Sequence, residues 1–138
     1  KAAAVADFKC STENCNKIKK KGDESTMLLE LTKNPDIIGE LGMLKENRIL
    51  VGFAAETENL LENASEKLKK KNLDLIIAND VSKSDIGFGS DNNEVIIIEV
   101  SGKTRHVPIM SKEEIANIIF DSIKKIIKKR KVVKDDWY

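Results

Sequence analysis

Short apolar runs alternate with segments of helical periodicity along most of this chain, and this alternation constrains the fold most strongly. We interpret four apolar runs as strands, namely Ala2–Phe8, Ser25–Thr32, Arg48–Ala54 and Leu73–Ala78. Asn34-Pro35-Asp36 predicts a helix that starts there and runs to about Lys45, and Glu56–Lys71 predicts a second helix. A strand–helix–strand order implies right-handed crossovers and a parallel sheet with helices on both faces.

The last third of the chain predicts a hairpin followed by a helix. Glu94–Val100 and Lys103–Ile109 flank Ser101-Gly102, a pattern typical of a β-hairpin. Ser111, with Glu114 three residues later, predicts a capped helix, and residues 131–138 are expected to be frayed. The fold class we predict is α/β: a three-layer, Rossmann-like and mostly parallel sheet with a C-terminal hairpin and helix.

Composition excludes several classes of protein. Hydrophobic residues make up 41% of the 138 residues, which is enough for one core and too much for a disordered tail. The formal net charge of +1 gives no argument for nucleic-acid or anionic-membrane binding. The longest run without a charged residue, Ile49–Ala55, is far shorter than the roughly 20 residues of a membrane span. We therefore expect a cytoplasmic protein that binds neither nucleic acid nor membrane.

Metal-binding residues are sparse. Cys10 and Cys15 are the only cysteines and His106 is the only histidine, so a zinc site would need all three and a carboxylate. Two reduced thiols and a plain strand histidine are the favoured interpretation. The sequence assigns no protein ligand to a metal ion.

Polar residues follow each interpreted strand at the edge where open α/β sheets bind ligands. Asp7 follows the first strand and could accept hydrogen bonds from ribose hydroxyls, or simply cap a neighbouring backbone group. Ala55, Glu56 and Thr57 follow the strand at Arg48–Ala54, and Asn79 and Asp80 follow the strand at Leu73–Ala78.

Lysines gather in two places where they could neutralise phosphate groups. One cluster is Lys17-Ile18-Lys19-Lys20-Lys21, and the other is formed by Lys67, Lys69, Lys70 and Lys71. A solvated loop and a helix C-terminus that favours cations explain the same patterns without a ligand. The two common glycine-rich phosphate motifs are absent from the sequence, so the residues alone predict an anion- and sugar-friendly edge but no reaction.

Read together, these segments resemble the phosphopantothenoylcysteine synthetase family, the ligase half of a bifunctional coenzyme A biosynthesis protein. The resemblance covers about residues 2–127. Its motifs are, in order, Ala3-Ala4-Val5-Ala6-Asp7-Phe8, Lys17-Ile18-Lys19-Lys20, Lys33-Asn34-Pro35-Asp36-Ile37, Val51-Gly52-Phe53-Ala54-Ala55-Glu56-Thr57, Lys71-Asn72-Leu73-Asp74 with Ala78-Asn79-Asp80-Val81, and Gly87-Phe88 with Ser90-Asp91-Asn92-Asn93.

The resemblance implies an activity. The family joins 4′-phosphopantothenate to L-cysteine through an acyl-cytidylate, with CTP converted to CMP and pyrophosphate. It implies Mg²⁺ with the triphosphate, and FMN only if a decarboxylase domain precedes this one. The choice between CTP and ATP cannot be made from the side chains.

The resemblance also implies roles for particular residues. Lys17 would stabilise the α-phosphate and is the catalytic candidate, Asp7 would hold the ribose, and Phe53 would lie by the base. The complete implied nucleotide site is Lys1, Ala2, Ala3, Asp7, Lys17, Pro35, Asp36, Ile37, Ile38, Phe53, Lys67 and Lys71.

The chain departs from the family at its start, where the glycine-rich unit and an Asn-containing segment do not occur. We therefore expect residues 1–131 to be the C-terminal two thirds of a ligase domain, incomplete for catalysis alone, with 132–138 as a tail. The resemblance implies a homodimer through Glu94–Ile109, although packing within one chain explains its isoleucines equally well. A non-catalytic regulatory or partner-binding subunit on the same fold is the alternative function.

Overall fold

The computed structural model describes residues 5–18, 26–82 and 89–135, and it divides the chain into two compact units. The smaller unit is Ala3–Ile37, and the larger is Ile38–Tyr138 with Lys1–Ala2. The larger unit carries a four-stranded sheet and the smaller a two-stranded one.

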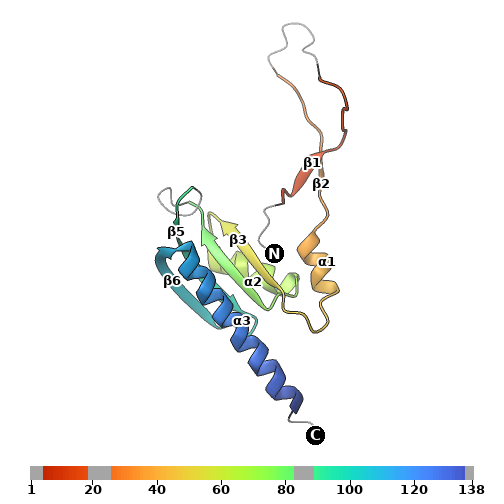
Figure 1. The fold of residues 1–138 in the computed structure, drawn as a ribbon. Coiled ribbons are helices and arrows are strands. Elements are labelled where there is room, and N and C mark those ends of the chain that lie inside the picture. The colour runs from red at the N-terminus through yellow and green to blue at the C-terminus, as the bar shows by residue number, and fades with distance from the viewer. Residues whose placement is uncertain (1–4, 19–25, 83–88, 136–138) are drawn as a thin grey trace. The chain divides into compact units, whose positions relative to one another are not determined.

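The sheet of the larger unit has the strand order β3-β4-β5-β6 (Figure 1). Its strands are β3 (Val51–Glu56), β4 (Leu75–Asp80), β5 (Asn92–Glu99) and β6 (Thr104–Ser111). β3 and β4 pair in parallel, whereas β4–β5 and β5–β6 pair antiparallel. The α/β class is confirmed, but the sheet is mixed rather than mostly parallel, because the predicted hairpin supplies two of its four strands.

Helices cover both faces of this sheet, which confirms the three-layer arrangement. β4 sends alternate side chains to opposite faces. Ile76 and Ala78 join a core cluster with Ala64 and Leu68 of α2 (Leu60–Lys70). Leu75 and Ile77 join a second cluster, which includes Ile115 and Ile119 of α3 (Lys112–Asp135). Figure 1 shows α2 and α3 on opposite sides of the sheet.

The smaller unit corrects the prediction for the first two strands. In the described parts of the expected buried strands at Ala2–Phe8 and Ser25–Thr32, the structure has short strands instead, β1 (Phe8–Cys10) and β2 (Leu31–Lys33); residues 2–4 and 25 lie outside the described residues. These two strands pair antiparallel with each other, and all their residues are exposed. Their apolar side chains indicated buried strands, but the described residues of this unit contribute none to either core cluster.

The first two helices begin later than predicted, and the last one is longer. α1 is Ile37–Met43, whereas the pattern places its start at Asn34. The Asn34 side-chain amide instead donates to the carbonyl of Ala6 at 2.8 Å. α2 begins at Leu60, after Asn59 in a left-handed conformation with a φ of 49°. α3 continues through the expected frayed segment to Asp135.

The predicted capping box of α3 is confirmed. Glu114 N–H donates to Ser111 Oγ at 3.2 Å, and the Glu114 carboxylate accepts from the Ser111 N–H at 3.1 Å and hydroxyl at 2.8 Å. Those two hydrogen bonds, the hydroxyl's first, lower the pKa of Glu114 below its ordinary value of 4.5. The helix therefore starts at a fixed point directly after β6.

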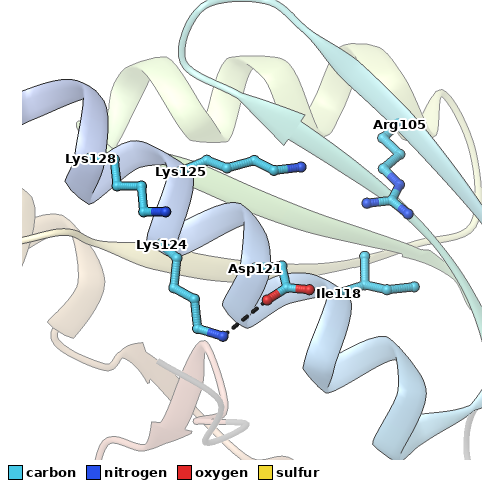
Figure 2. A pocket seen from close by; sticks show the side chains of 6 residues that line it. All are labelled: Arg105, Ile118, Asp121, Lys124, Lys125 and Lys128. Carbon is cyan, nitrogen blue, oxygen red and sulfur yellow. Dashed lines mark hydrogen bonds and ion pairs between the residues drawn. The ribbon is translucent and has the colours of Figure 1, made fainter.

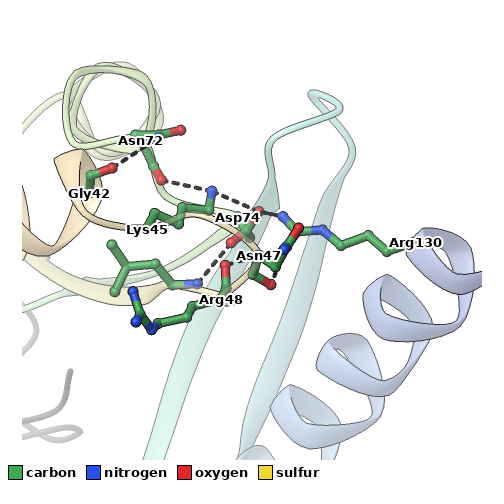
Figure 3. A network of polar contacts seen from close by, with 8 residues as sticks. Gly42, Lys45, Asn47, Arg48, Asn72, Asp74 and Arg130 are labelled. Atoms are coloured by element: carbon green, nitrogen blue, oxygen red, sulfur yellow. Dashed lines mark hydrogen bonds and ion pairs between the residues drawn. The ribbon is translucent and has the colours of Figure 1, made fainter. Parts of the chain in front are cut away.

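A buried charge network lies at the amino end of β4 (Figure 3). The Asp74 side chain is 2% exposed and forms ion pairs with Lys45, at 2.9 Å, and with Arg130. Its other oxygen accepts from the N–H of Leu50 at 2.8 Å. This carboxylate therefore connects the segment after α1, the start of β3 and the end of α3.

No helix within the described ranges is both long and apolar enough to cross a membrane.

Candidate functional site

The carboxyl ends of the two parallel strands lie side by side. Ala55 is opposite Asn79, and Glu56 is opposite Asp80. The N–H of Val81 donates to the Glu56 carbonyl at 3.0 Å, which continues the pairing beyond the strand ends. Ligands of open α/β sheets bind at such carboxyl ends. The prediction that the residues after these two strands share an edge is confirmed.

Glu56 is held through both of its carboxylate oxygens by α2. Lys67 Nζ forms an ion pair with Oε1, and Asn63 Nδ2 donates to Oε2 at 3.3 Å. The Glu56 side chain is 14% exposed and that of Lys67 is 45% exposed. The Glu56 carboxylate is therefore fixed and largely buried. The Lys67 side chain stays partly open to solvent beside the end of β3. Sequence reasoning named Lys67 as a candidate but missed its partner.

The other two candidates of the larger unit's sheet and helix are Lys71 and Phe53. Lys71 is the C-cap residue of α2, and its N–H donates at 3.0 Å to the carbonyl of Lys67, four residues earlier. Phe53 is 54% exposed and lies opposite Ile77, whose side chain belongs to the α3-side core. Strand alternation therefore puts Phe53 on the face of the sheet that α2 does not cover.

The remaining candidates fall mostly in the smaller unit. Asp7 and Lys17 are exposed there, and the Asp7 carbonyl accepts from the Asn34 N–H at 2.9 Å. The smaller unit ends with Pro35, Asp36 and Ile37. Ile38 belongs to the larger unit and packs against its α2-side core. The candidates Lys1, Ala2 and Ala3 lie outside the described residues, as do Lys19–Lys21 and Gly87-Phe88.

Two polar side chains that follow β4's buried run have distinct local roles. Asp80 Oδ1 accepts from the N–H of Ser82 at 3.0 Å and from its hydroxyl at 2.6 Å, so Asp80 caps the next turn. Asn79 Oδ1 is buried, and no donor within the described part of the chain reaches it. A buried acceptor without a partner is uncommon in folded proteins. No pattern in the sequence could have distinguished Asn79 from an ordinary strand-end amide.

A cationic pocket of about 250 Å³ lies between β6 and α3 (Figure 2). It is lined by Arg105, Ile118, Asp121, Lys124, Lys125 and Lys128. Asp121 and Lys124 pair at 3.0 Å but are 62% and 70% exposed, so water screens this pair. The other cations are exposed as well. We read this pocket as a solvated helix face and place the candidate site at the carboxyl edge.

The cysteines and the histidine do not form a metal centre. Cys10 and Cys15 are free, exposed thiols. His106 Nε2 lies 2.8 Å from Glu94 Oε1, across the β5–β6 pair. Within the described ranges, no three His, Cys, Asp or Glu side chains come together as metal ligands.

Residues 1–127 match the family described as the DNA/pantothenate metabolism flavoprotein C-terminal domain. The chain is 48% identical over 123 residues to the coenzyme A biosynthesis bifunctional protein CoaBC of Bacillus subtilis (strain 168), covering 89% of this chain and 30% of that protein. It is 45% identical over 125 residues to CoaBC of Escherichia coli (strain K12), covering 88% of this chain and 30% of that protein.

A solved structure agrees with these relatives. The crystal structure of the C-terminal domain of CoaBC matches with a TM-score of 0.69 and 31% identity, covering 92% of this chain and 53% of that one. The chain thus spans about a third of the length of the curated relatives. These matches confirm the resemblance drawn from the ordered motifs. Because the family model covers nearly the whole chain, this protein belongs to the DNA/pantothenate metabolism flavoprotein C-terminal domain family.

Proposed function

We propose that this chain forms the C-terminal two thirds of a ligase domain that joins 4′-phosphopantothenate to L-cysteine, with CTP as the activating nucleotide. One observation supports the proposal most strongly. At the carboxyl edge of the parallel strands, the largely buried carboxylate of Glu56 pairs with Lys67, whose side chain is 45% exposed and which is one of the lysines expected to contact a triphosphate. The family membership of residues 1–127 supports it independently.

The proposed reaction has two steps. The pantothenate carboxylate attacks the α-phosphorus of CTP, which gives an acyl-cytidylate and releases pyrophosphate. The cysteine amine then attacks the acyl carbon, the C–O bond to the phosphate breaks, and CMP leaves while the amine loses a proton. Activation is needed because a free carboxylate is a poor electrophile. The protein contributes mainly positioning and stabilisation of developing negative charge.

The candidate residues divide this work. We assign the β- and γ-phosphates to Lys67, which pairs with Glu56 at the end of β3, and to Lys71, because the family resemblance implies it. Phe53, exposed on the other face of β3, is assigned to the base. From the smaller unit, Lys17 would stabilise the α-phosphate and Asp7 would hold the ribose. Lys1, Ala2, Ala3 and the segment Pro35–Ile38 would contact the nucleotide as the family resemblance implies.

Mg²⁺ enters this proposal as part of the nucleotide substrate. A magnesium ion on a triphosphate usually keeps several waters and takes only one or two protein carboxylates. The described residues, which form no cluster of three metal ligands, fit that mode rather than a protein cage. FMN is proposed only for a polypeptide in which a decarboxylase domain precedes this one. The reaction is proposed to take place in the cytoplasm.

We also propose a homodimer through the hairpin at Glu94–Ile109. Ile97 and Ile98 of this hairpin are buried in the two core clusters, so they are used within the chain. The exposed apolar side chains left for a partner are Val100 and Ile109, at 65% and 58% exposure. Sedimentation of the protein and of Ile109→Lys tests the proposal: we expect a dimer that weakens in the variant, and a monomeric wild type would contradict it.

The activity is tested by pyrophosphate release. The full-length native protein, not residues 1–138 alone, is assayed with CTP, 4′-phosphopantothenate and cysteine, beside Lys17→Gln and, as a matched control, Lys9→Gln from the same unit. We expect Lys17→Gln to lower kcat by about a hundredfold, as loss of a charge-stabilising group does, with little change in Lys9→Gln. Undiminished turnover in Lys17→Gln would remove that residue from its role. No nucleotide-dependent release by the native protein would refute the function.

A further inference from the structure

We propose that Glu56 is a positioning residue that aims the Lys67 ammonium at the triphosphate. This inference rests on the proposed function and adds to it a residue that the family resemblance did not assign. It is carried by the ion pair at the end of β3 and by the burial of the carboxylate that forms it.

Glu56 is held by one backbone hydrogen bond and by two contacts of its carboxylate. The Glu56 backbone is the last position of β3, and its carbonyl accepts from Val81, so the residue cannot move away from the strand end. Its Oε2 accepts from Asn63 Nδ2 at 3.3 Å. That amide is itself held, because it also donates to the Glu58 carbonyl at 3.0 Å. Oε1 is left to face Lys67.

A fixed anion matters because a lysine side chain is otherwise mobile. Its long stem has many rotamers, and holding the ammonium in one place costs conformational entropy. In this chain the ion pair with Glu56 already restrains Lys67, so this conformational entropy is lost before any nucleotide binds. The Lys67 side chain remains 45% exposed, so a phosphate oxygen can approach it from solvent.

The pair does not saturate the lysine. An ammonium has three N–H donors, and one of them serves Glu56, which leaves two for phosphate oxygens. The Glu56 side chain is only 14% exposed, whereas the Lys67 side chain is 45% exposed. The Glu56 carboxylate therefore faces α2, and it holds the Lys67 ammonium where a phosphate can reach it.

The test is a double-mutant cycle on nucleotide binding. Calorimetric titrations with CTP and with inorganic tripolyphosphate compare the native protein, Glu56→Gln, Lys67→Met and the double variant. We expect Glu56→Gln to weaken both ligands by about tenfold, which is the typical effect of one charged hydrogen bond, and to add almost nothing once Lys67 is Met. In turnover, we expect KM for CTP to rise and kcat to change little.

Two further variants keep the test decisive. Glu66→Gln removes the same charge from an exposed position of α2 and should leave binding unchanged. Glu56→Asp keeps the carboxylate and should restore part of the affinity; it also replaces Glu56→Gln if that variant does not fold. Native-level binding by Glu56→Gln, or an equal loss in the Lys67→Met background, overturns the inference alone. No binding by the native protein overturns the proposed function and the inference with it.

Discussion

At the scale of single residues, Asp74 shows how a motif position can carry structure rather than chemistry. The sequence places it in a segment shared with the ligase family, next to buried apolar residues. The structure shows it 2% exposed, between Lys45 and Arg130 and bonded to the Leu50 N–H. Removing one member of such a buried network leaves the remaining charges without compensation.

We therefore predict that Asp74→Asn lowers the free energy of unfolding by about 3 kcal/mol. Lys45 and Arg130 keep their charges in the variant but lose the buried anion that compensates them. Urea unfolding measures the change. Asp121→Asn is the matched control, because Asp121 also pairs with a lysine but is 62% exposed, and it should cost less than about 0.5 kcal/mol. Equal losses in the two variants would contradict the network's role.

The residue scale also shows what the sequence could not reveal about the site. Lys67 and the strand-end residues Glu56 and Asp80 could be named because helix periodicity and apolar runs locate the ends of elements. That Glu56 pairs with Lys67 depends on side-chain directions across two elements, which no local pattern encodes. The buried Asn79 Oδ1 without a hydrogen-bond donor could not be predicted either, because its burial depends on the three-dimensional packing.

At the scale of elements, close packing explains one glycine. Gly42 is buried in α1, and its carbonyl accepts from Asn72 Nδ2 at 2.9 Å. A Cβ built on Gly42 would lie 2.1 Å from the backbone oxygen of Lys71. The two segments can approach this closely only because position 42 has no side chain.

Gly42→Ala should therefore destabilise the protein by about 2 kcal/mol, as overpacking typically does. The sign is informative, because alanine alone would favour a helix by about 1 kcal/mol over glycine. Thermal and urea unfolding measure it, with Met43→Ala, an exposed position of the same helix, as control. A more stable Gly42→Ala variant would show that the two segments do not touch.

The capping box of α3 gives a prediction with a pH dependence. Hydrogen bonds from Ser111 lower the pKa of Glu114, so its contribution to stability is present above pH 4.5 and is lost as the pH falls through the lowered value. Ser111→Ala removes the larger cause, and the pKa of Glu114 should return towards 4.5. Carbon NMR titration of the Glu114 carboxyl measures this. An unchanged pKa in Ser111→Ala would contradict the capping geometry.

Element boundaries show where local signals fail. The Ser111 box and the hairpin turn at Ser101-Gly102 were predicted because their residues decide the local backbone. The start of α1 was not, because the Asn34 amide bonds to Ala6, which is remote in sequence. A long-range hydrogen bond of this kind overrides a capping preference worth about 1 kcal/mol.

At the scale of the whole molecule, the two units differ in how they are stabilised. The larger unit has two core clusters on either side of β4. β1 and β2 of the smaller unit pair with each other and are exposed throughout. Apolar runs in the sequence predict a strand but not which sheet it joins, which is why Ala2–Phe8 was misplaced.

This difference predicts unequal protection of backbone amides. Those of Ile76 and Ile77 should exchange with solvent hydrogen only on global unfolding, because they lie in the middle of the sheet. Those of Phe8–Cys10 should exchange orders of magnitude faster, since exposed ladders open locally. Hydrogen exchange by NMR or mass spectrometry measures both. Comparable protection in the two strands would contradict the division.

We propose that this fold supports amide formation through an acyl-cytidylate, and one isotope measurement tests this directly. 4′-Phosphopantothenate labelled with ¹⁸O in its carboxylate is turned over with CTP and cysteine by the native protein, and the nucleotide product is analysed by mass spectrometry. Attack on the α-phosphorus, followed by cleavage of the acyl C–O bond, predicts one ¹⁸O atom in CMP and none in pyrophosphate. Unlabelled CMP, or ¹⁸O in inorganic phosphate with CDP as the product, would contradict the account.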